Sequence, residues 1–360
     1  MTGTPNSPLS VLVVDDSAVV RRYMDEVLSK VGGMSVRTAA DPMIAMRKMA
    51  EARPDVMILD VEMPRMDGLT FLRKIMAEDP IPVVICSGVT GRGSREAIEA
   101  LSRGAVEIVT KPKLGLRQFL QESADELIET VRAAARARLH RRPAAMRTAA
   151  EPLPPVAPPE ARRVRSERAR VVGIGCSTGG PEALEDILTR LPEESPPILI
   201  VQHMPAAFTG PFAQRLDQIC RPQVKEACDQ DLVVPGRVLI APGDDHMLLT
   251  TSVRAPYAVQ IVGGLPVSRH RPSANVLFRS MARAAGSRAL GIILTGMGDD
   301  GVEGLAEMRR AGAVTLAQDR ASSVIFGMPR EALERGAAQE TVALTDLPAR
   351  ILRETWGDGE

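Results

Sequence analysis

The 360-residue sequence predicts an α/β protein with two doubly wound, mostly parallel domains joined by a linker. Short apolar runs alternate with amphipathic stretches in both halves of the chain, which is typical of parallel sheets covered by helices. Between the halves this alternation stops, and six prolines fall between Pro143 and Pro159 within an arginine-rich stretch. We therefore expect a first domain at 9–130, a linker at 131–169 and a second domain at 170–352, in line with roughly 150 residues per domain.

The first domain is expected to alternate strictly between strand and helix. Continuous Val/Ile/Leu runs predict strands buried on both faces at 11–14, 35–39, 56–59, 83–86 and 106–109. Helical periodicity marks residues 17–31, 42–52, 68–78, 94–103 and 117–139. Right-handed crossovers then place helices on both sides of one parallel sheet.

The second domain repeats this pattern with a different set of strands. Apolar runs predict strands at 171–174, 198–201, 238–240, 289–294 and 313–316. A more β-rich insert is expected around 259–267. This half is therefore also expected to be a mostly parallel α/β domain.

Charge and cysteine content exclude several classes of protein. Lys plus Arg and Asp plus Glu both number 45, and this balance argues against a chain that coats nucleic acid or an anionic membrane. No apolar run approaches the roughly 18 residues that span a bilayer. We expect a cytoplasmic protein with reduced thiols, because the cysteines form no C-x-x-C pair: Cys86, Cys176, Cys220 and Cys228.

Polar residues follow four predicted strands of the first domain. Asp15 and Asp16 follow the first strand, Asp60 the third, Ser87 the fourth and Lys111 the fifth. The functional crevice of an open α/β sheet lies beyond the carboxyl ends of its strands, so these groups are expected to converge. Three converging carboxylates favour Mg²⁺, a hard cation that takes oxygen ligands. A carboxylate beside Mg²⁺ and a lysine is suited to attack phosphorus.

These residues lie in motifs that resemble the receiver domains of two-component response regulators. The motifs are V-L-V-V-D-D-S, L-D-V-E-M-P-R-M-D-G, V-I-C-S-G and T-K-P. The resemblance implies that Asp60 accepts a phosphoryl group from a histidine kinase, with Asp15, Asp16 and Asp60 at the Mg²⁺ site.

The same resemblance assigns two further roles and shows one departure. It implies that Lys111 contacts the phosphate and that Ser87 is the hydroxyl that follows it on activation. Receivers usually carry an aromatic residue three positions before the lysine, where this chain has Ile108. The chemistry of phosphorylation does not depend on that position, but a switch by rotation of an aromatic ring does.

The second domain opens with a candidate nucleophile. The segment V-V-G-I-G-C-S-T-G-G-P predicts a strand, a glycine-rich turn and a helix, and G-C-S-T-G fits the G-x-S-x-G elbow around Ser177. Such a turn leaves backbone N–H groups free to face an oxyanion. A phosphate-binding turn is the alternative, although the glycine spacing matches neither common nucleotide-binding pattern.

A serine nucleophile needs a histidine base and a carboxylate that orients it. His203 follows the strand at 198–201, on the same rim as Ser177, whereas His246 and His270 lie in A-P-G-D-D-H-M and R-H-R-P-S. The carboxylate can come from G-D-D-G, which holds Asp299 and Asp300. From the residues alone, the arrangement of Asp244 or Asp245 with His246 or His270 also remains open.

Motifs in the second domain resemble the catalytic domain of chemotaxis protein-glutamate methylesterases, from about 170 to 350. They are G-C-S-T-G-G, Q-H-M-P, I-A-P-G-D-D-H-M, R-H-R-P-S, L-T-G-M-G-D-D-G and F-G-M-P-R. The resemblance implies Ser177 as nucleophile, His203 as base and Asp300 as orienter, with Asp299 ranked second. Cys176 stands where the family usually has alanine, and we interpret it as a packing residue.

The resemblance also implies the reaction and its partners. Such an enzyme hydrolyses glutamate γ-methyl esters, and deamidates glutamines, on the cytoplasmic regions of chemoreceptors after phosphorylation of its receiver domain. It needs no cofactor in the esterase site, and its oxyanion hole is expected at the backbone N–H of Met297, with Thr178 nearby. The competing hypothesis is a non-catalytic, phospho-regulated adaptor that binds receptors, and the substitution Ser177→Ala distinguishes the two.

Overall fold

The computed structural model describes residues 8–63, 67–111, 119–139 and 170–356. The chain divides into two compact units, residues 1–139 and 140–360, and each is described by itself. Most of the linker expected at 131–169, namely residues 140–169, lies outside the described residues. Within the described parts, no helix is both long and apolar enough to cross a membrane.

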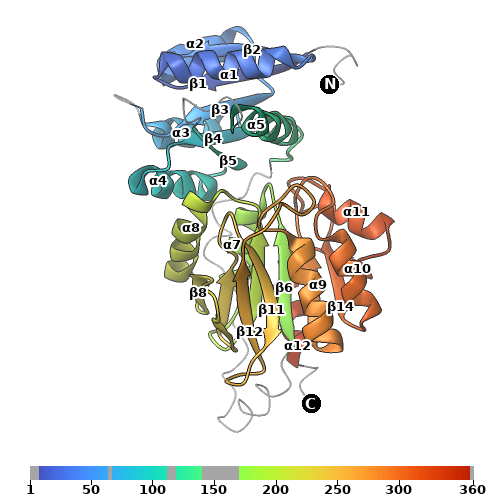
Figure 1. Cartoon of the computed structure of the whole chain (residues 1–360). Coiled ribbons are helices and arrows are strands. Elements are labelled where there is room, and N and C mark those ends of the chain that lie inside the picture. The colour runs from blue at the N-terminus through green and yellow to red at the C-terminus, as the bar shows by residue number, and fades with distance from the viewer. Residues whose placement is uncertain (1–7, 64–66, 112–118, 140–169, 357–360) are drawn as a thin grey trace. The chain divides into compact units, whose positions relative to one another are not determined.

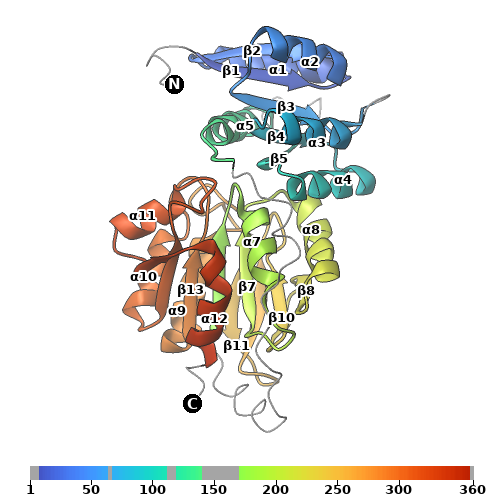
Figure 2. The same cartoon turned by 180° about the vertical axis from the view of Figure 1, so that it is seen from behind.

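The first unit is a five-stranded parallel sheet of order β2-β1-β3-β4-β5, with helices on both faces (Figures 1 and 2). Its strands are β1 (Leu9–Val14), β2 (Met34–Ala39), β3 (Val56–Asp60), β4 (Val83–Ser87) and β5 (Glu107–Thr110). Its helices are α1 (Ala18–Lys30), α2 (Pro42–Glu51), α3 (Gly68–Glu78), α4 (Gly91–Ser102) and α5 (Phe119–Ala135). Strands β3 and β4 are fully buried, as their apolar runs predict.

Side-chain caps decide where the helices of this unit begin. Ser17, Asp41, Asp67 and Thr90 each accept a hydrogen bond from a backbone N–H in the first turn of the following helix. The Thr90 cap explains why α4 starts at Gly91, earlier than its apolar periodicity predicts. Helix α5 continues to Ala135 and so extends into the range expected for the linker.

The second unit is a seven-stranded parallel sheet of order β15-β14-β13-β6-β7-β10-β8. Helices α7 and α12 cover one face, and α9 and α10 lie on the other beside the antiparallel hairpin β11–β12 (Figures 1 and 2). The strands are β6 (Val171–Cys176), β7 (Ile198–Gln202), β8 (Gln223–Glu226), β9 (Leu232–Val233), β10 (Arg237–Ile240), β11 (His246–Thr251), β12 (Tyr257–Val262), β13 (Ala289–Ile293), β14 (Val314–Gln318) and β15 (Glu340–Val342). The helices are α7 (Gly180–Leu188), α8 (Ala206–Ile219), α9 (Ala274–Ala284), α10 (Val302–Arg310), α11 (Met328–Glu334) and α12 (Leu347–Trp356), with short 3₁₀ turns at Gly286–Arg288 and Leu344–Asp346.

The order of this sheet reverses at β6. The chain proceeds from β6 to β7 and β10 on one side, and returns to β13 and β14 on the other. In open α/β sheets such a reversal creates a crevice at the carboxyl ends of the strands. The residues that follow β6, β7 and β13 therefore meet at one place.

The structure adds short strands that the apolar runs did not predict. Strands β8, β9 and β15 have only two to four residues and mixed polarity. The β-rich insert proves to be β12, which pairs with β11 and β9 in a three-stranded sheet. His246, which the sequence places after the preceding strand, is the first residue of β11.

Candidate active site and receiver pocket

The acidic residues of the first unit converge at the carboxyl edge of its sheet. One carboxylate oxygen from each of Asp15, Asp16 and Asp60 lies within 4.8 Å of the others. Asp15 and Asp60 are fully buried, whereas Asp16 is exposed. Lys111 Nζ lies 2.6 Å from Asp60 Oδ2 and 3.4 Å from Asp15 Oδ2. The pocket therefore brings together the three carboxylates and the lysine expected from the sequence.

The electrostatics of this pocket fit a bound cation. Burial, and then the charge of Asp60, raise the pKa of Asp15. Burial alone would lower the pKa of Lys111, but its hydrogen bond to Asp60 and the charge of Asp60 outweigh burial and raise it. Asp15 Oδ2 is buried and accepts no hydrogen bond of good geometry from the described residues. A buried carboxylate oxygen that accepts no such hydrogen bond and lies beside two other carboxylates suits a hard divalent cation.

Ser87 and Ile108, the other two positions singled out in the first domain, are buried. Ser87 ends β4, and its hydroxyl donates to the carbonyl oxygen of Gly93 at 3.1 Å. The backbone N–H of Lys111 donates to the Ser87 carbonyl oxygen at 2.8 Å, which ties the lysine to the end of β4. Ile108 is the second residue of β5, and only 3% of its surface is exposed.

Ser177 lies on the turn that joins β6 to α7. Gly179 has the left-handed backbone (φ 79°) that this turn needs, and α7 begins at the next residue. The Ser177 N–H donates to the Thr295 carbonyl oxygen at 3.0 Å, and the Gly180 N–H donates to the Ser177 carbonyl oxygen at 2.7 Å. A Cβ on Gly296 would lie 2.8 Å from Ser177 Cβ, so this glycine permits the close approach of the loop after β13.

His203 follows β7, next to β6, and its ring contacts Asp300. His203 Nε2 lies 2.8 Å from Asp300 Oδ2. An ionised carboxylate only accepts hydrogen bonds, so Nε2 carries the proton and Nδ1 is the basic nitrogen. Nδ1 is buried and has no hydrogen-bond partner among the described residues. The lone pair of Nδ1 is therefore available for a proton.

Asp300 is held by donors on both carboxylate oxygens. The Ser273 hydroxyl donates to Oδ1 at 2.6 Å, and the Ala274 and Asn275 N–H groups donate at 2.6 and 3.3 Å. These N–H groups begin α9, so the carboxylate also lies at a helix N-terminus. Burial would raise the pKa of Asp300, but the hydrogen bonds from His203, Ser273 and Ala274, with the electrostatic effect of the His203 ring, outweigh burial and lower it. Asp300 is thus kept ionised beside the imidazole.

A second imidazole covers the first. The His270 ring stacks on His203 with centroids 3.8 Å apart and planes 8° from parallel. Burial and the neighbouring His203 lower the pKa of His270 to about 3, so its ring is neutral near pH 7. His270 reaches this position through a tight turn whose residues, Ser268 and Arg269, both have left-handed backbones.

The alternative assignments find less support in the geometry. Both ring nitrogens of His246 bond to the backbone, at Leu265 (3.1 Å) and Ser273 (3.2 Å), which is typical of a structural histidine. Asp299 faces outward and pairs with Arg335 at 3.1 Å. Among the described residues, the one histidine–carboxylate pair within hydrogen-bond distance is His203–Asp300, and it involves neither Asp244 nor Asp245.

Backbone donors for an oxyanion are available beside Ser177. Across the described residues, the N–H groups of Met297 and Thr178 donate no hydrogen bond within the protein. The loop that carries Met297 is held in place by the preceding residue, because the Gly296 carbonyl oxygen accepts hydrogen bonds from the N–H groups of Gly327 and Met328. Three further residues of this site were not singled out from the sequence, although all of them lie within motifs quoted above: Gln202, Ser273 and Thr295.

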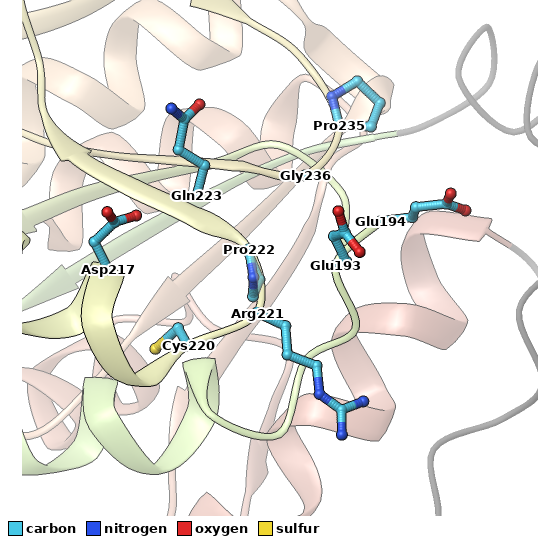
Figure 3. Close-up of a pocket in the computed structure, with 9 residues that line it drawn as sticks. All are labelled: Glu193, Glu194, Asp217, Cys220, Arg221, Pro222, Gln223, Pro235 and Gly236. Atoms are coloured by element: carbon cyan, nitrogen blue, oxygen red, sulfur yellow. The ribbon is translucent and has the colours of Figure 1, made fainter.

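A hollow of about 370 Å³ lies at the opposite edge of the sheet, before β8 and β10 (Figure 3). Glu193, Glu194 and Asp217 line it together with Cys220. Burial, with the charges of Glu185 and Asp217, raises the pKa of Cys220 to about 12, so its thiol stays protonated. Cys220 is therefore no thiolate nucleophile in this hollow.

Comparisons with known proteins identify the families that the two halves of the chain match. Residues 172–351 match the family model of the CheB methylesterase, and residues 11–122 match that of the response regulator receiver domain. The chain is 55% identical over 353 residues to a protein-glutamate methylesterase/protein-glutamine glutaminase of Xanthomonas campestris pv. campestris, covering 95% of this chain and 99% of that protein. A relative with the same name from Anaeromyxobacter dehalogenans is 53% identical over 345 residues, covering 95% and 98%.

A solved structure extends the comparison to the fold. The crystal structure of the Thermotoga maritima CheB methylesterase catalytic domain is 36% identical, with a TM-score of 0.50, and the match covers 51% of this chain and 98% of that one. The chain therefore belongs to the CheB methylesterase family and carries a response regulator receiver domain before its esterase domain.

Proposed function

We propose that this hydrolase removes methyl groups from glutamate γ-methyl esters on the cytoplasmic regions of chemoreceptors, and deamidates glutamines there, when Asp60 is phosphorylated. Membership of the family supports an esterase of chemotaxis signalling. The observation that carries the mechanism is the 2.8 Å distance between His203 Nε2 and Asp300 Oδ2. His203 follows β7, which pairs with β6, the strand that leads to Ser177. Ser177, His203 and Asp300 are accordingly proposed as nucleophile, base and orienting carboxylate.

The reaction proceeds in two halves. Ser177 Oγ attacks the ester carbonyl carbon while its proton passes to His203 Nδ1. The tetrahedral intermediate then expels methoxide, which takes this proton and leaves as methanol, and an acyl-enzyme remains. Water attacks the acyl-enzyme with the same base, which frees the glutamate carboxylate and restores Ser177. Base catalysis of this kind supplies roughly 10²–10⁴-fold.

The developing oxyanion is proposed to bind the Met297 N–H, with the Thr178 N–H beside it. Their lack of other acceptors supports this assignment. One donor of this kind contributes on the order of 10²–10³-fold. On glutamine the same steps release ammonia in place of methanol.

The receiver pocket is proposed to control the esterase. Asp60 accepts the phosphoryl group from a histidine kinase, Lys111 pairs with it, and Ser87 is the hydroxyl that follows it. Asp15, Asp16 and Asp60 would hold Mg²⁺, which when bound offsets charge on the transferring phosphoryl group. The added charge of roughly −1.5 to −2 is the signal passed to the esterase. We assign the receiver to 9–130, the linker to 131–169 and the catalytic domain to 170–352.

The test is methanol release from methylated chemoreceptor by the wild type and by Ser177→Ala, each with and without a small phosphodonor. The proposal expects release that the phosphodonor stimulates and that disappears in the variant. Release by neither protein would favour the receptor-binding adaptor. Equal release with and without phosphodonor would contradict control by the receiver.

A further inference from the structure

The side chain of Gln202 joins the backbones of the proposed nucleophile and base. Gln202 is the last residue of β7 and is fully buried. Its Nε2 lies 3.0 Å from the carbonyl oxygen of Ser177 and 3.0 Å from the carbonyl oxygen of His203. One amide group therefore uses both of its N–H donors on the two residues whose separation governs proton transfer.

The orientation of this amide follows from its partners. Carbonyl oxygens only accept hydrogen bonds, so the nitrogen must face Ser177 and His203 and Oε1 must face away. Cys176 Sγ lies 3.1 Å from Oε1, where its thiol can donate. Cys176 thus has a polar partner as well as a packing role.

The surrounding backbone leaves room for this arrangement. A Cβ on Gly180 would lie 2.1 Å from Gln202 Oε1 and 3.1 Å from Cys176 Sγ. The glycine at the start of α7 therefore allows the amide to reach between the ends of β6 and β7. Loss of the amide would leave the part-buried His203 carbonyl without this donor, whereas the Ser177 carbonyl would keep only its bond from the Gly180 N–H.

We propose that Gln202 is a positioning residue that sets the distance and angle between Ser177 and His203, and that the Cys176 thiol holds the Gln202 amide in place. This inference rests on the proposed esterase mechanism. Gln202 is fully buried, so it cannot contact the substrate, and its effect must pass through the residues that it bonds.

The first test is Gln202→Met, which keeps the length of the side chain and removes its donors. A misplacement of about 1 Å near reacting groups costs on the order of 10²-fold. We expect kcat for methanol release to fall by about 10- to 100-fold while KM stays within about twofold. The rate at which a fluorophosphonate labels Ser177 should fall in proportion to kcat.

A double-mutant cycle distinguishes positioning from general damage. If Gln202 acts by aligning His203 with Ser177, then Gln202→Met should cost nothing more in a His203→Ala background. Thr315→Val is the matched control, because Thr315 is buried and its hydroxyl donates to Ala337 O at 2.8 Å in a part of the sheet remote from Ser177. This control should lower the melting temperature and leave kcat unchanged.

Two outcomes overturn the proposal. One is a Gln202→Met protein that loses thermal stability as Thr315→Val does but keeps the wild-type kcat. The other is a Gln202→Met substitution that lowers kcat by the same factor in the His203→Ala background as in the wild type. If Gln202→Met does not fold, Cys176→Ser and Cys176→Ala decide: a lower kcat in the alanine variant, with serine near wild type, supports the role, and equal kcat values refute it. Ser177→Ala in the same assay tests the esterase mechanism separately.

Discussion

The substitution Asp300→Asn removes one negative charge from the proposed triad and leaves its shape intact. All four partners of the carboxylate are potential donors, so the new amide nitrogen must displace one acceptor oxygen. At Oδ1 the nitrogen faces the Ser273 hydroxyl, which can rotate to accept, and the distant Asn275 N–H (3.3 Å). At Oδ2 it would face the Ala274 N–H at 2.6 Å, which cannot accept. The asparagine oxygen therefore stays toward His203 and preserves the tautomer.

The expected loss of activity then comes only from the lost charge of Asp300, which stabilises the imidazolium that forms at His203 during the reaction. The attraction between two opposite unit charges about 4 Å apart amounts to about 4 kcal/mol at an effective dielectric constant of about 20. Each 1.36 kcal/mol is a factor of ten in rate, so kcat should fall on the order of 10³-fold. A variant with the wrong tautomer would lose about 10⁴-fold.

The assay is kcat for methanol release from methylated receptor, with circular dichroism as the check on folding. Ser273→Ala is the comparison variant, because it removes one bond to Asp300 and keeps the charge, and it should lose far less activity. An Asp300→Asn protein that keeps more than about a tenth of the wild-type kcat would refute the role given to this carboxylate.

Three further predictions concern the surroundings of the two sites. Gly296→Ala should lower kcat at least ~10-fold, because its Cβ would lie 2.8 Å from Ser177 Cβ and 3.0 Å from Ser177 N; wild-type activity would contradict the packing argument. Between pH 6.5 and about 3, His270 is protonated in the unfolded chain and neutral in the folded chain. The free energy of unfolding therefore decreases as the pH is lowered, by up to about 1.4 kcal/mol per pH unit. His270→Phe should therefore flatten this slope in denaturant unfolding, and an unchanged slope would show that His270 is protonated in the fold. Asp60→Asn, or chelation of Mg²⁺ by EDTA, should abolish stimulation by a phosphodonor and keep basal methanol release, whereas stimulation that persists would place the phosphoryl group elsewhere.

The parallel strands with continuous apolar runs, and the residues just beyond them, could be predicted from the sequence. A strand buried on both faces needs a continuous apolar run, and a polar residue directly after it must lie at the carboxyl edge. Asp60, Ser177 and His203 all follow this rule. Asp300 lies farther from its strand, and the residues alone did not separate it from Asp244.

The remaining features depend on contacts between distant segments. Ser273 and the start of α9 reach Asp300 only because the chain folds back across the sheet. His270 stacks on His203 through a turn with left-handed backbone at Ser268 and Arg269, where no glycine signals it. Short strands such as β8 and β15 take their conformation from the neighbours that they pair with, and not from an apolar run of their own.

The chemical identity of the nucleophile is the central claim, and labelling tests it most directly. The protein would be treated with a fluorophosphonate, digested, and the modified residue located by mass spectrometry, with His203→Ala as a parallel sample. The proposed mechanism predicts one label per chain on Ser177, formed far more slowly in His203→Ala. A label on Cys176 or another residue, or labelling of Ser177 at the same rate without His203, would contradict it.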